Sequence, residues 1–273
     1  MPPNSAQALP GGDAPEGMPQ QVERRLVAAR EGGEIALSYF RKDPRRWTKE
    51  NDSPVSEADL AVDRHLAQAL KAARPDYGWL SEETAETVRA DDAGRTFVVD
   101  PIDGTRAFIE GRKSWCVSVA IVEQGRPVAG VLDCPALSEI YSAASGQGAW
   151  MDGVALRVGP PSTPARLAGP RNLIDSLKPP AIDIRQMPYV PSLAYRIAMI
   201  AGRALDATFV RPNANDWDLA AADLILEEAG GQLLTFDGQV PRYLREDPRH
   251  GALLAGSGGL LSELAAAAAK TGY

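Results

Sequence analysis

Two aspartates stand three positions apart at the end of an apolar stretch, in the sequence TFVVDPIDGT. The residues TFVV are strand formers, and a buried, stiff strand would hold Asp100 accurately in place. Pro101 has a fixed φ and no N–H that could compete for either carboxylate, and its turn brings Asp103 back toward Asp100. The same turn frees the carbonyl oxygen of Ile102. Carboxylate and carbonyl oxygens are the hard ligands that Mg²⁺ binds, so the motif indicates a divalent-cation site.

Gly104 and Thr105 complete the motif by presenting backbone N–H groups where a helical turn can begin. N–H groups at the start of a helical turn suit a phosphate group. The competing interpretation is a tight turn with solvated acids, and for a bare DxxD spacing it would be preferred. The preceding apolar strand and the following Gly-Thr favour a metal and phosphate site instead.

Two further pairs of acids stand beside apolar segments. Glu82 and Glu83 follow YGWL, and unpaired charges are rare at the end of a buried strand unless a counter-ion is present. Asp216 and Asp218 stand at the start of DWDLAAADLILEEAGG, which has a helical pattern, and one of them is the expected N-cap. Each pair alone is also explained without a function, the first by a solvent-facing loop and the second by stabilisation of a helix dipole.

The segments WLSEE, VVDPIDGT and DWDLAAADLILEEAGG, in this order and at these separations, resemble the inositol monophosphatase superfamily. The resemblance covers roughly residues 23–257. It implies a Mg²⁺-dependent, lithium-sensitive phosphatase, that is, a hydrolase of phosphoric monoesters. The segment KENDSPVSEADLAVD further resembles the branch that contains 3'(2'),5'-bisphosphate nucleotidases, although Ser56 stands where a threonine is usual.

The resemblance implies a role in metal binding for five residues. Glu82, Asp100 and the carbonyl oxygen of Ile102 would hold a first Mg²⁺ ion. Asp100, Asp103 and Asp218 would hold a second ion, so Asp100 bridges the two. Glu82 is also placed to touch a third, weaker ion, which makes the expected cofactor two or three Mg²⁺ ions.

Other residues are implied to bind the phosphate and the attacking water. Backbone N–H groups of Gly104 and Thr105 would cradle the phosphate, while the Thr105 hydroxyl, oriented by Asp59, would position the water. Glu83 would support the metal ligands without binding an ion, and Lys49 would lie near the phosphate. The residues expected to act in the reaction itself are Asp59, Glu82 and Thr105.

Substrate choice depends on a residue just before the second acidic pair. In FVRPNANDWD, Arg211 stands about where inositol-specific relatives carry a glutamate, and arginine favours a second phosphate. The prediction is hydrolysis of 3'-phosphoadenosine 5'-phosphate to AMP and phosphate. Alternatives are an inositol-1-phosphatase or sugar bisphosphate phosphatase, a regulatory metal-binding protein without catalysis, and an Arg211 that only lies at the surface. Tyr195 and Arg196 are further candidates for the pocket wall, although Tyr195 also fits simple packing.

Composition limits the partners that the chain can have. The 273 residues are 44% hydrophobic, as in ordinary globular proteins, and the net charge is -7. No basic stripe is present, which argues against duplex nucleic acid, and an acidic protein can still bind the small phosphorylated substrate that the resemblance implies if metal ions supply the positive charge. No apolar stretch approaches the ~20 residues of a membrane helix. A cytoplasmic enzyme is expected. The family is often dimeric, but the sequence identifies no interface for a homodimer.

Cysteines and histidines indicate no other metal chemistry. Cys116 and Cys134 fit a reducing compartment and plain packing better than a disulfide. His65 and His250 form no ligand pattern with them, which argues against a zinc site.

The elements that must position these residues are read from hydrophobic periodicity. A helix is expected over residues 19–40, a polar loop over 42–55 that could act as a lid, and a helix with Ser56 as N-cap and Asp59 in the capping-box position. Residues 115–158 have the pattern of an antiparallel meander. The second half alternates strands and helices, with expected strands at 166–168, DATFV and HGALLAGS, and expected helices from 172, 192, 216 and 257.

Two lobes follow from this change of pattern. The segment GPPSTPARLAGP has the composition of a joint, so the expected division is a tail at 1–20, an α+β lobe at 21–158 and an α/β lobe at 159–273. The resemblance implies a layered α/β sandwich in which helix and sheet layers alternate and the metal ions lie between the lobes.

Overall fold

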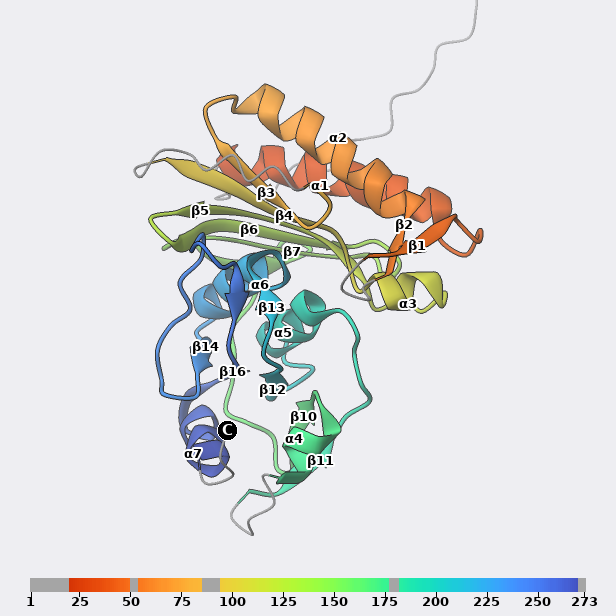
Figure 1. The fold of residues 1–273 in the computed structure, drawn as a ribbon. Helices are drawn as coiled ribbons and strands as arrows, with labels where there is room; N and C mark the ends of the chain where they lie inside the picture. The colour runs from red at the N-terminus through yellow and green to blue at the C-terminus, as the bar shows by residue number, and fades with distance from the viewer. Residues whose placement is uncertain (1–19, 50–53, 85–93, 177–181, 270–273) are drawn as a thin grey trace, which may run out of the picture.

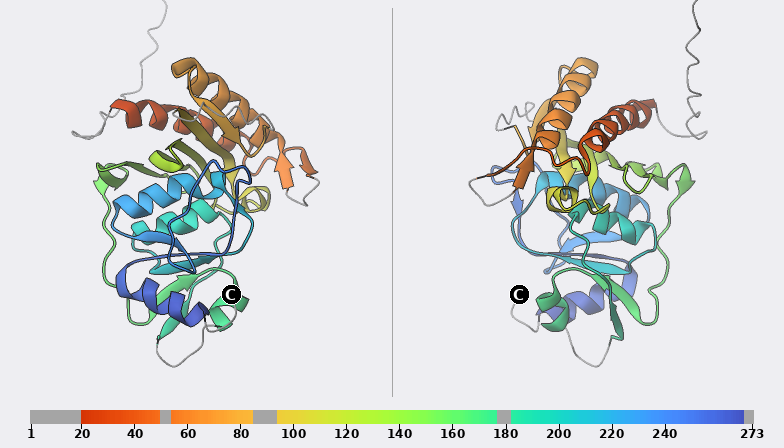
Figure 2. Two further views of the ribbon diagram at one scale, coloured as in Figure 1. Left: turned by 60° about the vertical axis from the view of Figure 1, so that its left-hand side comes forward. Right: turned by 90° about the vertical axis from the view of Figure 1, so that its right-hand side faces the viewer.

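Helices and sheets alternate in layers through the computed structural model, which describes residues 20–49, 54–84, 94–176 and 182–269. A pair of helices, a large sheet, a second pair of helices, a smaller sheet and a last pair of helices follow one another (Figures 1 and 2). The layered α/β sandwich predicted from the sequence is therefore confirmed. The expected tail at 1–20 lies almost wholly outside the described residues.

The large sheet has seven strands in the order β3-β4-β5-β6-β7-β8-β9, parallel between β3 and β4 and antiparallel elsewhere. Its central strands are buried along almost their whole length because helices cover both faces. The strands are β3 (Gly78–Ser81), β4 (Arg95–Asp103), β5 (Cys116–Glu123), β6 (Arg126–Cys134), β7 (Glu139–Ala144), β8 (Gly148–Met151) and β9 (Val154–Ala155).

Helices α1 (Gln20–Tyr39) and α2 (Glu57–Ala73) cover the outer face of this sheet (Figure 1). Apolar residues at helical spacing in α2, among them Val62 and Leu66, pack against Trp79 and Phe97 of the sheet. Ser56 is the N-cap of α2 and Asp59 completes a capping box, as the sequence predicts.

Helices α5 (Leu193–Ala201) and α6 (Asp216–Glu228) lie between the large sheet and the smaller one (Figure 1). The smaller sheet has the strand order β11-β10-β12-β16-β14. Its strands are β10 (Ala165–Ala168), β11 (Ile184–Gln186), β12 (Ala207–Val210), β14 (Gln232–Thr235) and β16 (Leu253–Gly256). The last layer consists of α4 (Arg171–Ser176) and α7 (Gly258–Ala269), while β13 (Ala214–Asn215) and β15 (Arg249–His250) form a separate ribbon.

Several short elements differ from the prediction. The expected loop at 42–55 contains an antiparallel hairpin of β1 (Arg46–Thr48) and β2 (Pro54–Ser56). The expected strand HGALLAGS is split into β15 and β16, which pair with different partners. Strands β11 and β14 were not predicted, because three or four residues of ordinary composition show no clear periodicity and their partner strands lie elsewhere in the sequence.

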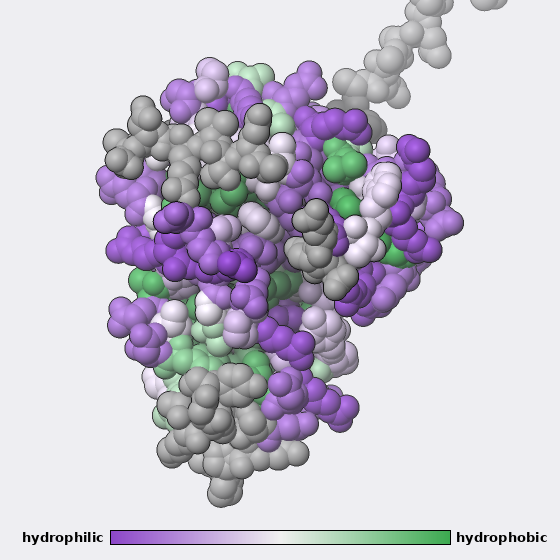
Figure 3. All heavy atoms as spheres, viewed as in Figure 1, coloured by the Kyte–Doolittle hydropathy of each residue, from purple (hydrophilic) through white to green (hydrophobic). Residues whose placement is uncertain are grey.

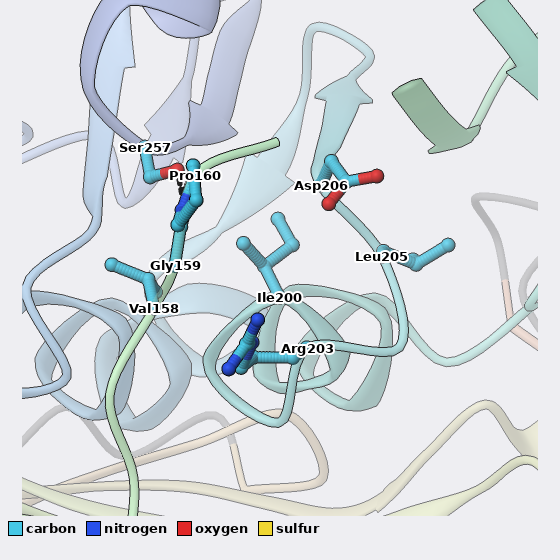
Figure 4. Close-up of a pocket in the computed structure, with 8 residues that line it drawn as sticks. All are labelled: Val158, Gly159, Pro160, Ile200, Arg203, Leu205, Asp206 and Ser257. Carbon is cyan, nitrogen blue, oxygen red and sulfur yellow. Dashed lines mark hydrogen bonds between the residues drawn. The ribbon is translucent and has the colours of Figure 1, made fainter. Parts of the chain in front are cut away.

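The chain passes from the large sheet to the smaller one between β9 and β10, where the lobe boundary after residue 158 is predicted. The N–H of Val158 donates to the carbonyl of Ala229, and the Ser257 hydroxyl donates to the carbonyl of Gly159. A side chain at position 159 would meet the guanidinium of Arg203, whose Nη2 lies 2.9 Å from the ideal Cβ position (Figure 4). The joint is thus packed in place and not a free linker.

The molecular surface is mostly hydrophilic on the face shown in Figure 3, with hydrophobic residues in separate patches. Among the described residues, no helix is both long enough and apolar enough to cross a bilayer.

Candidate active site

Three aspartates from two elements meet at one edge of the large sheet. Asp100 and Asp103 end β4, and Asp218 lies in the first turn of α6. Each offers one carboxylate oxygen, and these oxygens lie within 4.8 Å of one another. Asp100 and Asp103 are buried, at 1% and 5% exposure. The fold therefore brings together acids that stand more than a hundred positions apart in the sequence.

The electrostatics of this cluster fit a divalent cation. Burial raises the pKa of Asp100 well above its usual range, and the charges of Glu82, Asp103 and Asp218 raise it further. Burial and the charge of Asp103 likewise raise the pKa of Asp218. Packed acids that repel one another are costly without a counter-ion. Several carboxylate oxygens facing one point are the donor set that Mg²⁺ prefers.

The chain turns after Asp100, as the proline at position 101 predicts, and Asp103 lies close to Asp100. The register between β4 and β5 shifts between Asp100 and Asp103. The N–H of Ile102 donates to Asp100 Oδ1 at 3.0 Å, which fixes the carboxylate. The carbonyl oxygen of Ile102 lies 3.0 Å from the Thr105 hydroxyl oxygen and has two lone pairs, so it can still offer one of them to a cation.

Thr105 and Asp59 make the contact that the resemblance implies. The Thr105 hydroxyl lies 3.1 Å from Asp59 Oδ1, and Asp59 Oδ2 accepts both the N–H and the hydroxyl of Ser56. Burial raises the pKa of Asp59 to about 6, although the bonds from Ser56 oppose the shift. Gly104 is the N-cap of α3 (Thr105–Ile109) and has a φ of 92°, a conformation that favours glycine.

Asp103 is held by the N-terminus of α5. Its Oδ2 accepts the Ser192 hydroxyl and the Ala194 N–H at 2.7 Å, and its Oδ1 accepts the Leu193 N–H. Burial raises the pKa of Asp103, and the bond from Ser192 opposes this shift most strongly. The sequence indicates Asp103 as a ligand but does not indicate this support.

Glu82 and Glu83 are joined by a lysine. Lys49 Nζ lies 3.0 Å from Glu82 Oε1 and 2.7 Å from Glu83 Oε1. Glu82 thus stays outside the three-aspartate cluster, although its charge raises the pKa of Asp100. Burial raises the pKa of Glu83 to about 7 in spite of the bond from Lys49. Lys49 therefore forms ion pairs with both glutamates, and its expected place near the phosphate stays a prediction.

The sequence model of the inositol monophosphatase family matches residues 19–272. This chain belongs to the inositol monophosphatase family. Family members generally use Mg²⁺, and the three-aspartate cluster supplies suitable ligands. The resemblance inferred from the motifs is confirmed for the family, while the closer likeness to the nucleotidase branch stays a prediction.

Named relatives agree with this membership. The chain is 32% identical over 235 residues to a histidinol-phosphatase of Chlorobaculum parvum, covering 81% of this chain and 88% of the relative. It is 33% identical over 197 residues to an inositol-1-monophosphatase of Mesorhizobium japonicum, covering 67% and 73%. The extragenic suppressor protein suhB from Bartonella henselae superposes with a TM-score of 0.81 at 25% identity, covering 92% of this chain and 99% of that one. The chain is accordingly a phosphoric monoester hydrolase of the inositol monophosphatase family.

In this inositol monophosphatase family member, a pocket of ≈ 270 Å³ opens beside the three-aspartate cluster. It is lined by Asp103 and Asp218 and also by Arg211, which is exposed and donates to Asn172 Oδ1 at 3.2 Å. Arg211 therefore lies on the side of the acids, as the substrate prediction requires. Asn172 was not identified from the sequence, because nothing in its surroundings marks it.

Two other expectations about the pocket wall are corrected or refined. Tyr195 is buried and packs against Tyr141, with 6.2 Å between ring centroids, so the packing interpretation is right. Arg196 borders the pocket, but its guanidinium donates to Thr208 Oγ1 and to the carbonyls of Val190 and Phe209. Burial lowers the pKa of Arg196, and its donors are already used by the protein.

The N-terminus of α6 also differs from the prediction. Its N-cap is Asn215, and neither of the two acids has that position. Asp218 accepts the Asn215 N–H at 2.7 Å, while Asp216 is paired with His250 Nε2 at 2.7 Å in the interior. Asn and Asp are equally good N-caps, so the sequence NANDWD does not by itself show which of these residues caps the helix.

A second pocket, of ≈ 510 Å³, borders the glutamates of the same site. Trp47, Trp217 and Leu60 give it an apolar wall beside Glu82 and Lys49. Trp47 lies in the β1–β2 hairpin, which was expected to be a lid-like loop. The sequence marks neither tryptophan as a site residue, because tryptophan is common in cores and at surfaces alike.

Proposed function

We propose that this chain hydrolyses a small phosphate monoester with water at a centre of two or three Mg²⁺ ions. The observation that carries the proposal is the joint placement of the three aspartates with the Thr105–Asp59 pair at one edge of the sheet. Glu82, Asp100 and the Ile102 carbonyl would hold a first ion, and Asp100, Asp103 and Asp218 a second. When bound, Mg²⁺ would neutralise the phosphate and make water a better nucleophile.

The chain's own residues would orient both reactants. Backbone N–H groups of Gly104 and Thr105, at the start of α3, would bind phosphate oxygens. The Thr105 hydroxyl donates its proton toward Asp59, so its lone pairs remain free to accept a proton from the attacking water. Asp59 is fixed by Ser56 and gives this hydroxyl one orientation. Glu83 would keep Lys49 beside Glu82 without binding an ion.

Arg211 supports a substrate with a second anionic group. Its exposed guanidinium lines the same pocket as Asp103 and Asp218. If these aspartates hold the phosphate of the substrate through metal ions, the alcohol portion of the ester would face Arg211. A guanidinium binds a phosphate through two parallel hydrogen bonds. We infer 3'-phosphoadenosine 5'-phosphate as the substrate, with AMP and phosphate as products. Inositol 1-phosphate, or a sugar bisphosphate, is the alternative.

A histidinol-phosphatase activity is a second candidate, because the relative from Chlorobaculum parvum has that name. Histidinol phosphate carries an ammonium group, which would need a carboxylate in the pocket. Among the described residues, the only carboxylates that line the Arg211 pocket are Asp103 and Asp218, and both are assigned to the metal. Arg211 would repel the ammonium group, so this pocket favours a substrate whose alcohol portion carries a negative charge.

Phosphate release from four esters with Mg²⁺ tests the proposal. We expect the highest kcat/KM for 3'-phosphoadenosine 5'-phosphate, followed by inositol 1-phosphate, fructose 1,6-bisphosphate and histidinol phosphate. Arg211→Gln should lower kcat/KM for the adenosine bisphosphate about tenfold or more and change inositol 1-phosphate little. Arg203→Gln, at the joint in Figure 4, is the matched control.

Three outcomes would speak against parts of this proposal. Equal rates on the adenosine bisphosphate and inositol 1-phosphate would exclude the nucleotidase assignment. A preference for histidinol phosphate would select the second candidate. Metal binding without release of phosphate from any ester would support the regulatory, non-catalytic alternative.

A further inference from the structure

A buried carboxylate that the proposed reaction does not use lies behind the glutamates. Asp63 of α2 is 6% exposed, and both of its oxygens accept hydrogen bonds from hydroxyl groups. The Ser81 hydroxyl lies 2.5 Å from Oδ1, and the Thr84 hydroxyl lies 2.7 Å from Oδ2. These two hydroxyls bracket Glu82 and Glu83 in the sequence, so Asp63 holds both ends of the turn that carries the glutamates.

The carboxylate of Asp63 sets the direction of the two hydroxyl hydrogen bonds at this turn. A carboxylate can only accept, so both hydroxyls must donate to it. The lone pairs of Ser81 Oγ are then free for the Glu83 N–H at 3.3 Å, and Thr84 Oγ1 accepts Trp79 Nε1 at 3.4 Å. One orientation of the turn satisfies all these groups, which is how a buried polar network specifies a single arrangement.

The other side of the turn is tied to the aspartate cluster. The Glu82 N–H donates to the carbonyl of Val99 at 3.2 Å, and Val99 immediately precedes Asp100. The turn is therefore attached to β4 beside the cluster and to α2 through Asp63. Any rotation of the turn would move Glu82 relative to Asp100.

Asp63 and Asp59 stand one helical turn apart on the buried face of α2. Asp59 orients Thr105, and Asp63 orients the turn that carries Glu82 and Glu83. One face of α2 therefore supports two separate parts of the site. Any shift of α2 would displace Thr105 and the glutamate turn together.

We propose that Asp63 is a positioning residue that aims Glu82 at the first metal position, an inference that rests on the proposed function. A ligand held by a fixed outer partner binds metal more tightly, and loss of such a partner costs about 10- to 100-fold in affinity. In this chain the outer partner acts through Ser81 and Thr84. Residues of this kind escape motif analysis because they touch neither metal nor substrate.

Calorimetric titration of the metal-free protein with Mn²⁺ tests this inference without an activity assay. Asp63→Ala should weaken Mn²⁺ binding at the first metal position about tenfold or more, and Asp63→Asn, which keeps one acceptor, should restore most of the affinity. Asp206→Asn is the matched control. Asp206 is also 6% exposed and hydrogen-bonded, but it pairs with Arg166 near the joint in Figure 4. The Asp206→Asn substitution should lower the midpoint of unfolding without changing the affinity for Mn²⁺.

A double-mutant comparison shows whether Asp63 acts through the hydroxyls. Ser81→Ala with Thr84→Val should weaken Mn²⁺ binding as much as Asp63→Ala, and the triple variant should be no worse than either. Unchanged affinity in Asp63→Ala, with a lower unfolding midpoint, would overturn the inference. If Asp63→Ala does not fold, unchanged affinity in the Ser81 and Thr84 variants would overturn it equally. A wild-type chain that binds no Mn²⁺ would instead refute the proposed function.

Discussion

Ser192 donates a 2.5 Å hydrogen bond to Asp103, joining the N-terminus of α5 to the acid at the end of β4. Ser192 is also the N-cap of α5, since its hydroxyl oxygen accepts the Tyr195 N–H. One side chain therefore caps the start of a helix in the second half of the chain and fixes a proposed metal ligand in the first half.

Replacing Ser192 by alanine should affect both roles. Loss of a serine N-cap costs about 1 kcal/mol, and loss of a donor to a buried carboxylate adds to this cost. We expect a lower free energy of unfolding in urea and roughly threefold to tenfold weaker Mn²⁺ binding. Ser38→Ala, which removes an exposed hydroxyl bonded only to the Ile35 carbonyl, should change neither quantity. Wild-type metal affinity in Ser192→Ala would show that the backbone N–H groups suffice.

Removal of Mg²⁺ should destabilise the protein, because the aspartates then repel one another in the interior. At saturating Mg²⁺ we expect Tm to rise by roughly 5 °C or more above its value in EDTA. Asp100→Asn should be more stable than wild type in EDTA, because one of the repelling charges is gone, and should not respond to Mg²⁺. Asp206→Asn should keep the full response. Thermal unfolding of the three proteins with and without metal makes the comparison, and a Mg²⁺ response in Asp100→Asn would contradict it.

The metal-free protein should show an unusual carboxyl titration. Burial raises the pKa of Asp59 from 3.8 to about 6. The unfolded chain therefore ionises at lower pH than the folded one, so stability declines as pH rises from about 4 to about 6. Carbon NMR of the Asp59 carboxyl in metal-free protein measures the midpoint. Ser56→Ala removes a donor to the charged form and should raise the midpoint further. A midpoint near 4 in both proteins would show that the site is well hydrated.

Gly104 should tolerate no side chain. Its φ is 92°, and a Cβ would lie 3.0 Å from Ser192 Cβ and 3.1 Å from the Ser114 carbonyl oxygen. Gly104→Ala should cost stability and abolish phosphate release, because the proposed phosphate-binding N–H groups would move. Gly146→Ala separates the two effects, since Gly146 has a φ of 71° but nothing within 4 Å of the added carbon. That control should cost about 1 kcal/mol and leave phosphate release unchanged.

Local features of the sequence determined much of the proposed site. The apolar strand before Asp100, the proline after it and the Gly-Thr that follows define a strand, a turn and a helix start within ten residues. The capping box at Ser56 is equally local. Such features depend on neighbouring residues in the chain, so they can be predicted without knowledge of the fold. The family could be predicted because three such motifs occur in a fixed order.

Only the tertiary structure decided which distant groups support the ligands. Ser192 on Asp103, Lys49 between the glutamates and Asp63 behind Glu82 are contacts across 89, 33 and 18 positions. A serine, a lysine and a helical aspartate are ordinary residues at those places. Their roles arise because burial removes water from the carboxylates, and each carboxylate must then take its hydrogen bonds from whatever the packed layers bring within reach. That choice is made by the packing of helices on the sheet, which no short stretch of sequence contains.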